Sequence, residues 1–307
     1  MRIVVLGSAA GGGLPQWNCG CNNCRAARAG DPAVAPRTQS SLAISTDGRA
    51  WFLLNVSADV RSQLANNRAL WPDESARRAS PIQACILTDG EIDHTSGLLQ
   101  LREGCQFSVY STPVVRTWLA EQFPVGRIVA AFADRPWREF QGNAEFEPSL
   151  ADGSPSGLRI RAIDMQGDAP RYVAAHSGPV PGACVAMLIT DLQNGTTMLY
   201  APGIPALSEP LRAAADQAQC LLVDGTFWHD RELVDLKIST LTARDMGHVP
   251  ISGSGGTLEW LRTQPGKQRV YVHINNTNPV LLEGSPEHAE VIGSGIRVAY
   301  DGDHFDI

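Results

Sequence analysis

The sequence predicts an α/β protein in which two mixed β-sheets are flanked by helices. Short apolar segments typical of buried strands recur along the whole chain. Asp47-Gly48 and Asn194-Gly195 each separate two such segments, which is the pattern of antiparallel hairpins. Segments with helical periodicity are interleaved with the strands, and the sequence contains no linker, repeat or low-complexity tract. We therefore expect residues 1–307 to form one domain.

The expected elements follow one another from the first residues to the last. Apolar runs predict strands at residues 3–6, 41–44, 51–54, 84–87, 106–110, 158–163, 183–190, 196–200, 220–223, 269–273 and 296–298. Helical periodicity is present at residues 58–70, 112–122, 204–217 and 256–262. Residues 142–157 are rich in turn formers and acids, so we expect a surface loop there.

The composition excludes several classes of protein. The chain has 307 residues, 43% of them hydrophobic, which is enough for a large buried core. Its net charge of −7 and the lack of a long basic run disfavour nucleic-acid binding. No apolar run is long enough to span a membrane, and the short apolar start differs from a signal peptide. We expect a cytoplasmic protein.

Three cysteines near the N-terminus have the spacing of a metal site. Cys19, Cys21 and Cys24 form C-x-C-x-x-C, and thiolates suit Zn(II), which needs one further ligand for a closed tetrahedral site. A redox pair or an iron–sulfur cluster is the alternative, although a cluster usually requires a fourth cysteine. We expect a structural zinc in the loop at residues 19–24. A histidine such as His304, a carboxylate, an amide or a partner subunit would supply the fourth ligand, and the last source would tie the zinc to the homodimer that we expect.

The densest group of ionisable side chains lies in residues 88–94, TDGEIDH. This segment follows the apolar run 84–87, and loops at strand ends are where α/β proteins place their chemistry. It gathers three carboxylates and one imidazole within six residues. A metal ion is the simplest reason for such a group.

The same segment resembles the signature of the metallo-β-lactamase superfamily, in which His-x-His-x-Asp-His follows a strand. Thr88 matches the residue that usually precedes the signature. Asp89 and Glu91 stand in place of its first two histidines, whereas Asp93 and His94 are retained. The resemblance implies a four-layer αββα sandwich.

Later segments extend this resemblance. His176 stands where the superfamily has the histidine of its third motif, and His273 matches its last histidine ligand. Residues 199–203 (LYAPG) lie where a bridging aspartate would end a strand, and they contain no carboxylate. Asp224 and His248 lie in segments that resemble the phosphodiesterase-like branch.

Within the superfamily, the chain resembles the branch that serves in biosynthesis of pyrroloquinoline quinone (PQQ). This resemblance rests on residues 14–19 (LPQWNC), the cysteine cluster, residues 88–94 and residues 273–279 (HINNTNP). It implies an enzyme that oxidises a peptide-derived, crosslinked Glu–Tyr intermediate by hydroxylating its tyrosine ring. A carrier that moves PQQ or its precursor to the periplasm is one alternative, and a zinc-dependent hydrolase is another.

The retained ligands of the superfamily imply an active-site metal on Asp93, His94 and His273. Two imidazoles and one carboxylate are the arrangement of non-haem Fe(II) oxygenases, although the same set suits Zn(II) and hydrolysis. The resemblance favours Fe(II) with dioxygen as a co-substrate. The expected catalytic residues around this metal carry protons or orient imidazoles, and they are Asp89, Glu91, His176, Asp224 and His248.

Three asparagines follow the last of these histidines. Asn275, Asn276 and Asn278 would contact an acidic substrate or cap a turn, and we expect the turn for at least one of them.

Overall fold

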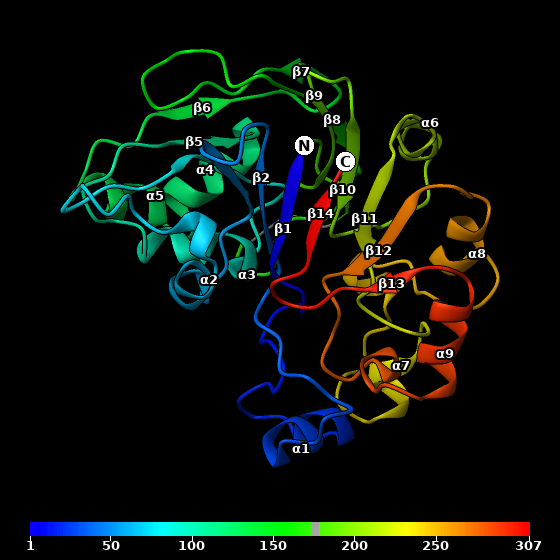
Figure 1. Ribbon diagram of the computed structural model, residues 1–307. Coiled ribbons are helices and arrows are strands. Elements are labelled where there is room, and N and C mark those ends of the chain that lie inside the picture. The colour runs from blue at the N-terminus through cyan, green and yellow to red at the C-terminus, as the bar shows by residue number, and fades with distance from the viewer. Residues whose placement is uncertain (174–177) are drawn as a thin grey trace.

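The computed structural model describes residues 1–173 and 178–307, whose strands form two sheets of seven strands each (Figure 1). The first sheet has the order β14-β1-β2-β3-β4-β5-β6. Its strands are β1 (Arg2–Gly7), β2 (Ser41–Ser45), β3 (Trp51–Leu54), β4 (Ile82–Ile86), β5 (Ser108–Ser111), β6 (Trp137–Glu139) and β14 (His304–Asp306). Strands β3 to β6 are parallel and the others are antiparallel, so the sheet is mixed.

The second sheet has the order β13-β12-β11-β10-β9-β8-β7. Its strands are β7 (Glu145–Phe146), β8 (Leu158–Asp164), β9 (Val185–Asp191), β10 (Thr197–Ala201), β11 (Cys220–Asp224), β12 (Gln268–Val272) and β13 (Arg297–Val298). Strands β10 to β13 are parallel and β7 to β10 are antiparallel, so this sheet is mixed as well.

Helices cover the outer faces of both sheets (Figure 1). The α-helices are α1 (Asn22–Ala29), α2 (Val60–Asn66), α3 (Ile92–Thr95), α4 (Pro113–Glu121), α5 (Val125–Ala130), α6 (Glu209–Gln217), α7 (Glu232–Asp235), α8 (Thr257–Arg262) and α9 (Pro286–Gly293). The 3₁₀ turns are η1 (Arg68–Leu70), η2 (Ser96–Leu99), η3 (Arg244–Met246) and η4 (Pro279–Leu281). No helix in the part of the chain that is described has the length and apolar character needed to cross a membrane.

The alternation of strand side chains explains the four layers. Ile3 and Val5 of β1 pack with Leu222 of β11 in the core between the sheets, whereas Val4 and Leu6 pack on the opposite face. That outer face meets α2, α4 and α5, and the outer face of the second sheet meets α6, α8 and α9. The predicted four-layer αββα sandwich with two mixed sheets is therefore confirmed.

Each strand expected from an apolar run has a strand at its position, and both predicted hairpins are antiparallel. Two helix predictions need correction. The segment 58–70 is divided at Asn67 into α2 and η1, and residues 204–208 are not helical. Helix α6 begins after Ser208, whose side chain accepts a hydrogen bond from the backbone N–H of Leu211. The expected loop at 142–157 contains the short strand β7.

Two contacts join the sheets at the end where the candidate residues lie. Asp89, just beyond β4, forms a bridge with Cys184, just before β9. Ala9, just beyond β1, forms another with Ile274, just beyond β12. The loop after β4 therefore meets the segment before β9, and the loop after β1 meets the loop after β12, across the boundary between the two sheets.

Candidate metal centre

The loop after β4 holds His94 in a fixed orientation. The Nδ1 atom of His94 lies 2.9 and 2.8 Å from the two carboxylate oxygens of Asp89. The Thr88 hydroxyl donates to Asp89 at 2.7 Å and is itself held by the side chain of Asn55. Because Asp89 is an acceptor, Nδ1 of His94 carries a proton and Nε2 points to the other side of the ring.

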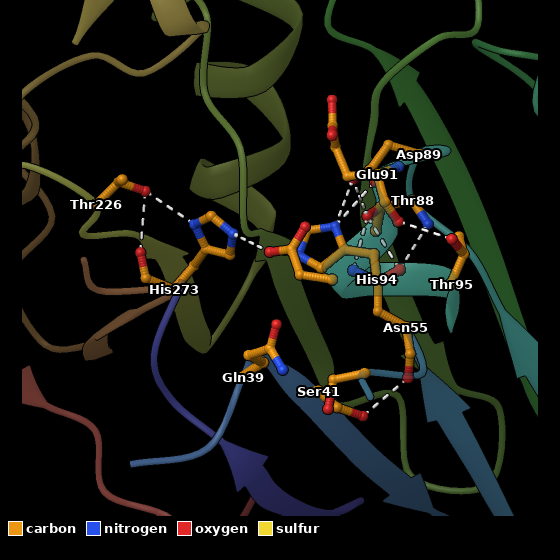
Figure 2. A network of polar contacts seen from close by, with 12 residues as sticks. Gln39, Ser41, Asn55, Thr88, Asp89, Glu91, His94, Thr95, Thr226 and His273 are labelled. Atoms are coloured by element: carbon orange, nitrogen blue, oxygen red, sulfur yellow. Dashed lines mark hydrogen bonds and ion pairs between the residues drawn. The ribbon is translucent and has the colours of Figure 1, made fainter. Parts of the chain in front are cut away.

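The Nε2 atom of His94 faces two further donor atoms. It lies 3.9 Å from Oδ2 of Asp93, and the same carboxylate oxygen lies 3.4 Å from Nε2 of His273. Figure 2 shows the imidazoles of His94 and His273 directed toward each other, with Asp89 and Thr226 on their outer sides. Asp93, His94 and His273 form one of the described groups whose donor atoms are close enough to share a metal ion.

Thr226 fixes the second imidazole as Asp89 fixes the first. Its hydroxyl lies 2.6 Å from Oδ1 of Asp224 and 2.8 Å from Nδ1 of His273. Because the hydroxyl has only one proton and donates it to the Asp224 carboxylate, Nδ1 of His273 must be the donor to the hydroxyl oxygen. The Nε2 atom of His273 is directed toward Asp93.

A second carboxylate–imidazole pair lies beside His273. Nδ1 of His248 contacts Oδ2 of Asp224 at 2.7 Å, and the His248 ring is stacked on the His273 ring with centroids 5.5 Å apart. Asp224 is fully buried at the end of β11, and the backbone N–H of Ile204 also donates to it. Asp224, His248 and His273 form another group of donors within reach of one another.

The backbone at His273 is unusual. This residue follows the last residue of β12 and has φ of 54°, a left-handed conformation that is uncommon for residues other than glycine. Such a conformation persists only where surrounding contacts hold it, and it is frequent at functional sites. Here two backbone hydrogen bonds hold the neighbouring Ile274. Its N–H donates to the carbonyl oxygen of Ser8, and its carbonyl oxygen accepts from the N–H of Ala10.

The electrostatics of the site favour a cation. Burial of the His94 imidazole opposes its protonation, but the carboxylates of Asp89 and Asp93 outweigh burial and raise the pKa of His94 to about 9. Burial opposes ionisation of Asp93, yet the two imidazoles beside it lower the pKa of this carboxyl below its ordinary value. The negative charge that favours an imidazolium also favours a divalent metal ion.

The residues present fit such an ion. Nε2 of His94 is buried and has no hydrogen-bond partner among the residues that the structure describes. A buried polar atom without a partner is costly unless a ligand satisfies it. Asp93, His94 and His273 offer one carboxylate and two imidazoles on one side, which leaves other coordination positions open.

These side chains line a cavity of about 1220 Å³. This is larger than a pocket for a drug-sized ligand, so there is room for a peptide-derived molecule. Phe227, Leu236 and Ile238 contribute apolar wall, and Arg171 contributes a cation. Glu91 also lines this cavity, where burial by the surrounding walls and the charges of Asp89 and Asp93 raise its pKa to about 7.

The structure brings together all the predicted site residues that it describes around this metal position. Asp89, Glu91, Asp93, His94, His248 and His273 line the cavity, and Asp224 lies buried behind His248. His176 lies outside the described residues. The contribution of Thr226 was not predicted; the signal was its position two residues after the aspartate that ends a buried strand.

The cysteine cluster forms part of the same cavity. Cys19 and Cys21 line it, and their sulfur atoms lie with that of Cys24 within reach of one metal ion. His304, offered as a fourth ligand, lies on the edge strand β14 and does not belong to that donor group. Asn278 caps η4 through a bond from the backbone N–H of Val280, which confirms the turn expected for one of the asparagines.

Comparison with known proteins agrees with the fold. A model of the β-lactamase superfamily domain matches residues 50–274. A coenzyme PQQ synthesis protein B of Pseudomonas paraeruginosa is 44% identical over 313 residues, with both chains covered completely. The crystal structure of Zn(2+)-bound PqqB from Methylobacterium extorquens has a TM-score of 0.91 at 39% identity, with complete coverage of both chains. A diphosphatase of the PhnP family covers 100% of this chain and 97% of its own at a TM-score of 0.64 and 15% identity, which shows the fold alone.

Proposed function

The chain belongs to the coenzyme PQQ synthesis protein B (PqqB) family, and from that premise we propose that it is a metal-dependent oxygenase of PQQ biosynthesis. Its substrate would be the crosslinked Glu–Tyr precursor, whose tyrosine ring gains a hydroxyl group. One oxygen atom of dioxygen is inserted into a C–H bond of the ring, which becomes C–OH. Two electrons and two protons from an external reductant convert the other atom to water.

The observation that carries this proposal is the three-donor face of Asp93, His94 and His273. Asp89 and Thr226 contact Nδ1 of the two imidazoles, so both Nε2 atoms are left to face Asp93, which is the orientation that a metal ligand requires. When bound there, Fe(II) would supply open positions where dioxygen and the substrate can meet.

Other residues of the chain would bind substrate and move protons. Arg171 on the cavity wall suits a substrate carboxylate, and the apolar residues of the same cavity suit an aromatic ring. Glu91, a carboxylate on the cavity wall beside Asp89 and Asp93, would accept a proton from the phenol. Asp224 holds His248 as a hydrogen-bonding group beside the ring of His273.

The ordinary zinc hydrolysis of the superfamily has less support. Asp89 stands where that chemistry would have a histidine ligand, and both of its oxygens contact His94. The segment 199–203, which would supply the bridging carboxylate, has none. A carrier for PQQ or its precursor is favoured by one observation, the size of the cavity.

A reconstitution experiment separates these functions. Protein loaded anaerobically with Fe(II) receives the crosslinked substrate, a reductant and ¹⁸O-labelled dioxygen, and mass spectrometry follows the product. We expect one labelled oxygen atom in the tyrosine ring, no reaction with His94→Ala, and full reaction with His304→Ala, which changes an exposed histidine on β14.

Two results would contradict the proposal. A product without labelled oxygen, together with ester or amide hydrolysis by the Zn(II)-loaded protein, would indicate a hydrolase. Stoichiometric binding of PQQ without turnover, unchanged by His94→Ala, would indicate a carrier.

A further inference from the structure

The side chain of Asn276 lies against all three sulfur atoms of the cysteine cluster. Its Nδ2 atom is 3.1 Å from Sγ of Cys19, 3.5 Å from Sγ of Cys21 and 3.2 Å from Sγ of Cys24. Asn276 is only 3% exposed. One terminal amide atom thus caps the triangle that the three sulfurs form.

These distances match the fourth corner of a tetrahedral zinc site. With Zn–S bonds of about 2.3 Å and a Zn–O bond of about 2.1 Å, tetrahedral angles place the oxygen roughly 3.6 Å from each sulfur. The terminal atom of Asn276 lies 3.1, 3.5 and 3.2 Å from the three sulfurs, at most about half an ångström closer than that separation.

Backbone N–H groups lie beside all three sulfur atoms of the cluster. The sulfur of Cys19 accepts from the backbone N–H of Cys21 at 3.4 Å, and that of Cys21 from the N–H of Cys24 at 3.5 Å. The sulfur of Cys24 accepts from the N–H of Gln16 at 3.3 Å. Each sulfur therefore has one backbone donor, and such donors stabilise the anionic form that binds metal.

The amide of Asn276 can present oxygen in place of nitrogen. Its backbone is held, because the side chain of Asn23 donates to the carbonyl oxygens of Asn276 and Asn278 at 3.0 and 2.9 Å. The two ends of an amide have nearly the same shape, so a half-turn of the terminal group exchanges them with little movement elsewhere. Oxygen is the end that coordinates a metal.

We propose that Asn276 supplies the fourth ligand of the cysteine metal site through its side-chain oxygen. The site is then closed within one chain and needs neither His304 nor a partner subunit. Because Asn276 follows His273 by three residues, the metal on the cysteines also anchors the loop that carries His273. This inference does not depend on which reaction the other metal serves.

Cobalt binding tests the ligand directly. Thiolate-to-cobalt charge-transfer absorption reports the cysteine site alone, so titration of metal-free protein with Co(II) against a chelator gives its affinity. We expect Asn276→Ala to weaken that affinity by at least the 10- to 100-fold typical of losing an outer-shell partner. Asn276→Asp, which retains an oxygen donor, should restore most of it.

Asn22→Ala is the matched control, because Asn22 lies between Cys21 and Cys24 at the start of α1, with its side chain exposed and bonded to Arg25. It should bind Co(II) as the unchanged protein does. Equal affinities for Asn276→Ala and Asn22→Ala would overturn the assignment.

Measurements on the unchanged protein cover the case in which the variants fail to fold. A crystal structure of the zinc-loaded protein should place the Asn276 oxygen about 2.0–2.2 Å from the metal. A histidine, a water molecule or an atom of a second chain in that position would refute the proposal. Zinc should also slow hydrogen exchange at the amides of Ile274, Asn275 and Asn278, and unchanged exchange would refute the anchoring.

Discussion

Asp89 contacts His94 through both carboxylate oxygens, and this contact decides which ring nitrogen can bind a metal. At this position the superfamily signature has a histidine ligand. Here Asp89 would not bind the metal itself. It accepts a hydrogen bond from His94, which orients that imidazole and increases its basicity. Thr226 does the same for His273 from the other sheet.

Replacing Asp89 by Asn should therefore weaken the metal site without removing a direct ligand. The neutral amide accepts a weaker hydrogen bond from Nδ1 and can also present its NH₂ end, so the ring loses its fixed tautomer. We expect a 10- to 100-fold loss of metal affinity, on the order found for other outer-shell partners, in a competition titration with a chelator. Asp168→Asn, an exposed change on the same cavity wall, should leave the affinity unchanged, and equal losses in the two variants would contradict this role of Asp89.

Glu232 of α7 gives a prediction for pH dependence. Burial raises the pKa of Glu232 to about 7, although the backbone N–H of Trp228 and the hydroxyl of Thr277 donate to its carboxylate. In the unfolded chain a glutamate titrates near about 4.3, so the folded protein retains this proton longer. The contribution of Glu232 to stability is thus complete below about pH 4.3 and is lost as the pH rises to about 7.

The free energy of unfolding should consequently decrease by roughly 4 kcal/mol through Glu232 as the pH rises between these limits. Urea unfolding at several pH values should show a weaker dependence in Glu232→Gln than in the unchanged protein. Asp235→Asn on the exposed side of the same helix serves as the control. If the two variants have parallel pH profiles, Glu232 is not the buried acid described here.

At the scale of elements, the site depends on how short segments after β4, β11 and β12 are held. The short helix α3 is fixed on its sheet by two bonds with Val56, one from the N–H of Gly97 and one to the carbonyl of His94. A Cβ atom on Gly97 would lie 2.0 Å from the carbonyl oxygen of Ser57, so the close approach requires glycine. This contact sets the position of His94.

Gly97→Ala should therefore destabilise the protein and disturb the metal site together. Overpacking of this kind costs on the order of 1–3 kcal/mol, measured as a lower midpoint of urea unfolding, and we expect weaker metal binding with it. Gly293→Ala near the end of α9 has open space around the new methyl group. That control should be neutral or stabilising by about 0.4–1 kcal/mol. A Gly97→Ala protein as stable as Gly293→Ala would show that the loop is not packed as described.

Most of the strands, though not β6, β7 or β14, and the residues that carry chemistry could be predicted, because buried strands are continuous apolar runs and the ligands lie at their ends. Other elements were missed for physical reasons. β7 has two residues and little apolar character, and α9 buries only Val291, so its cap at Ser285 was the sole clear signal. Asn276 acts through cysteines far along the chain, and no local pattern marks such contacts.

At the scale of the whole molecule, the metal position lies where the two sheets meet. Asp93 and His94 follow β4 of the first sheet, and His273 follows β12 of the second. A metal held by all three connects the sheets and binds the folded state only. Such binding stabilises a protein by about 2.7 kcal/mol when the free metal concentration is a hundredfold above its dissociation constant.

Removal of metal by a chelator should lower the midpoint of thermal unfolding, and added metal should restore it. Added metal should raise the unfolding midpoint of the His94→Ala variant by less than that of the unchanged protein. The difference between the two increases measures the contribution of this site. Calorimetry gives both midpoints. Identical gains in the two proteins would mean that the metal position does not join the sheets.

The segment 273–276 has a further consequence for the order of assembly during synthesis. His273 meets Asp93 across 180 residues of chain, and Asn276 meets Cys19 across 257. The early donors of both clusters therefore leave the ribosome long before the late ones exist. Neither cluster reaches its full donor set until nearly the whole chain has been made, so both sites are completed on an almost finished protein.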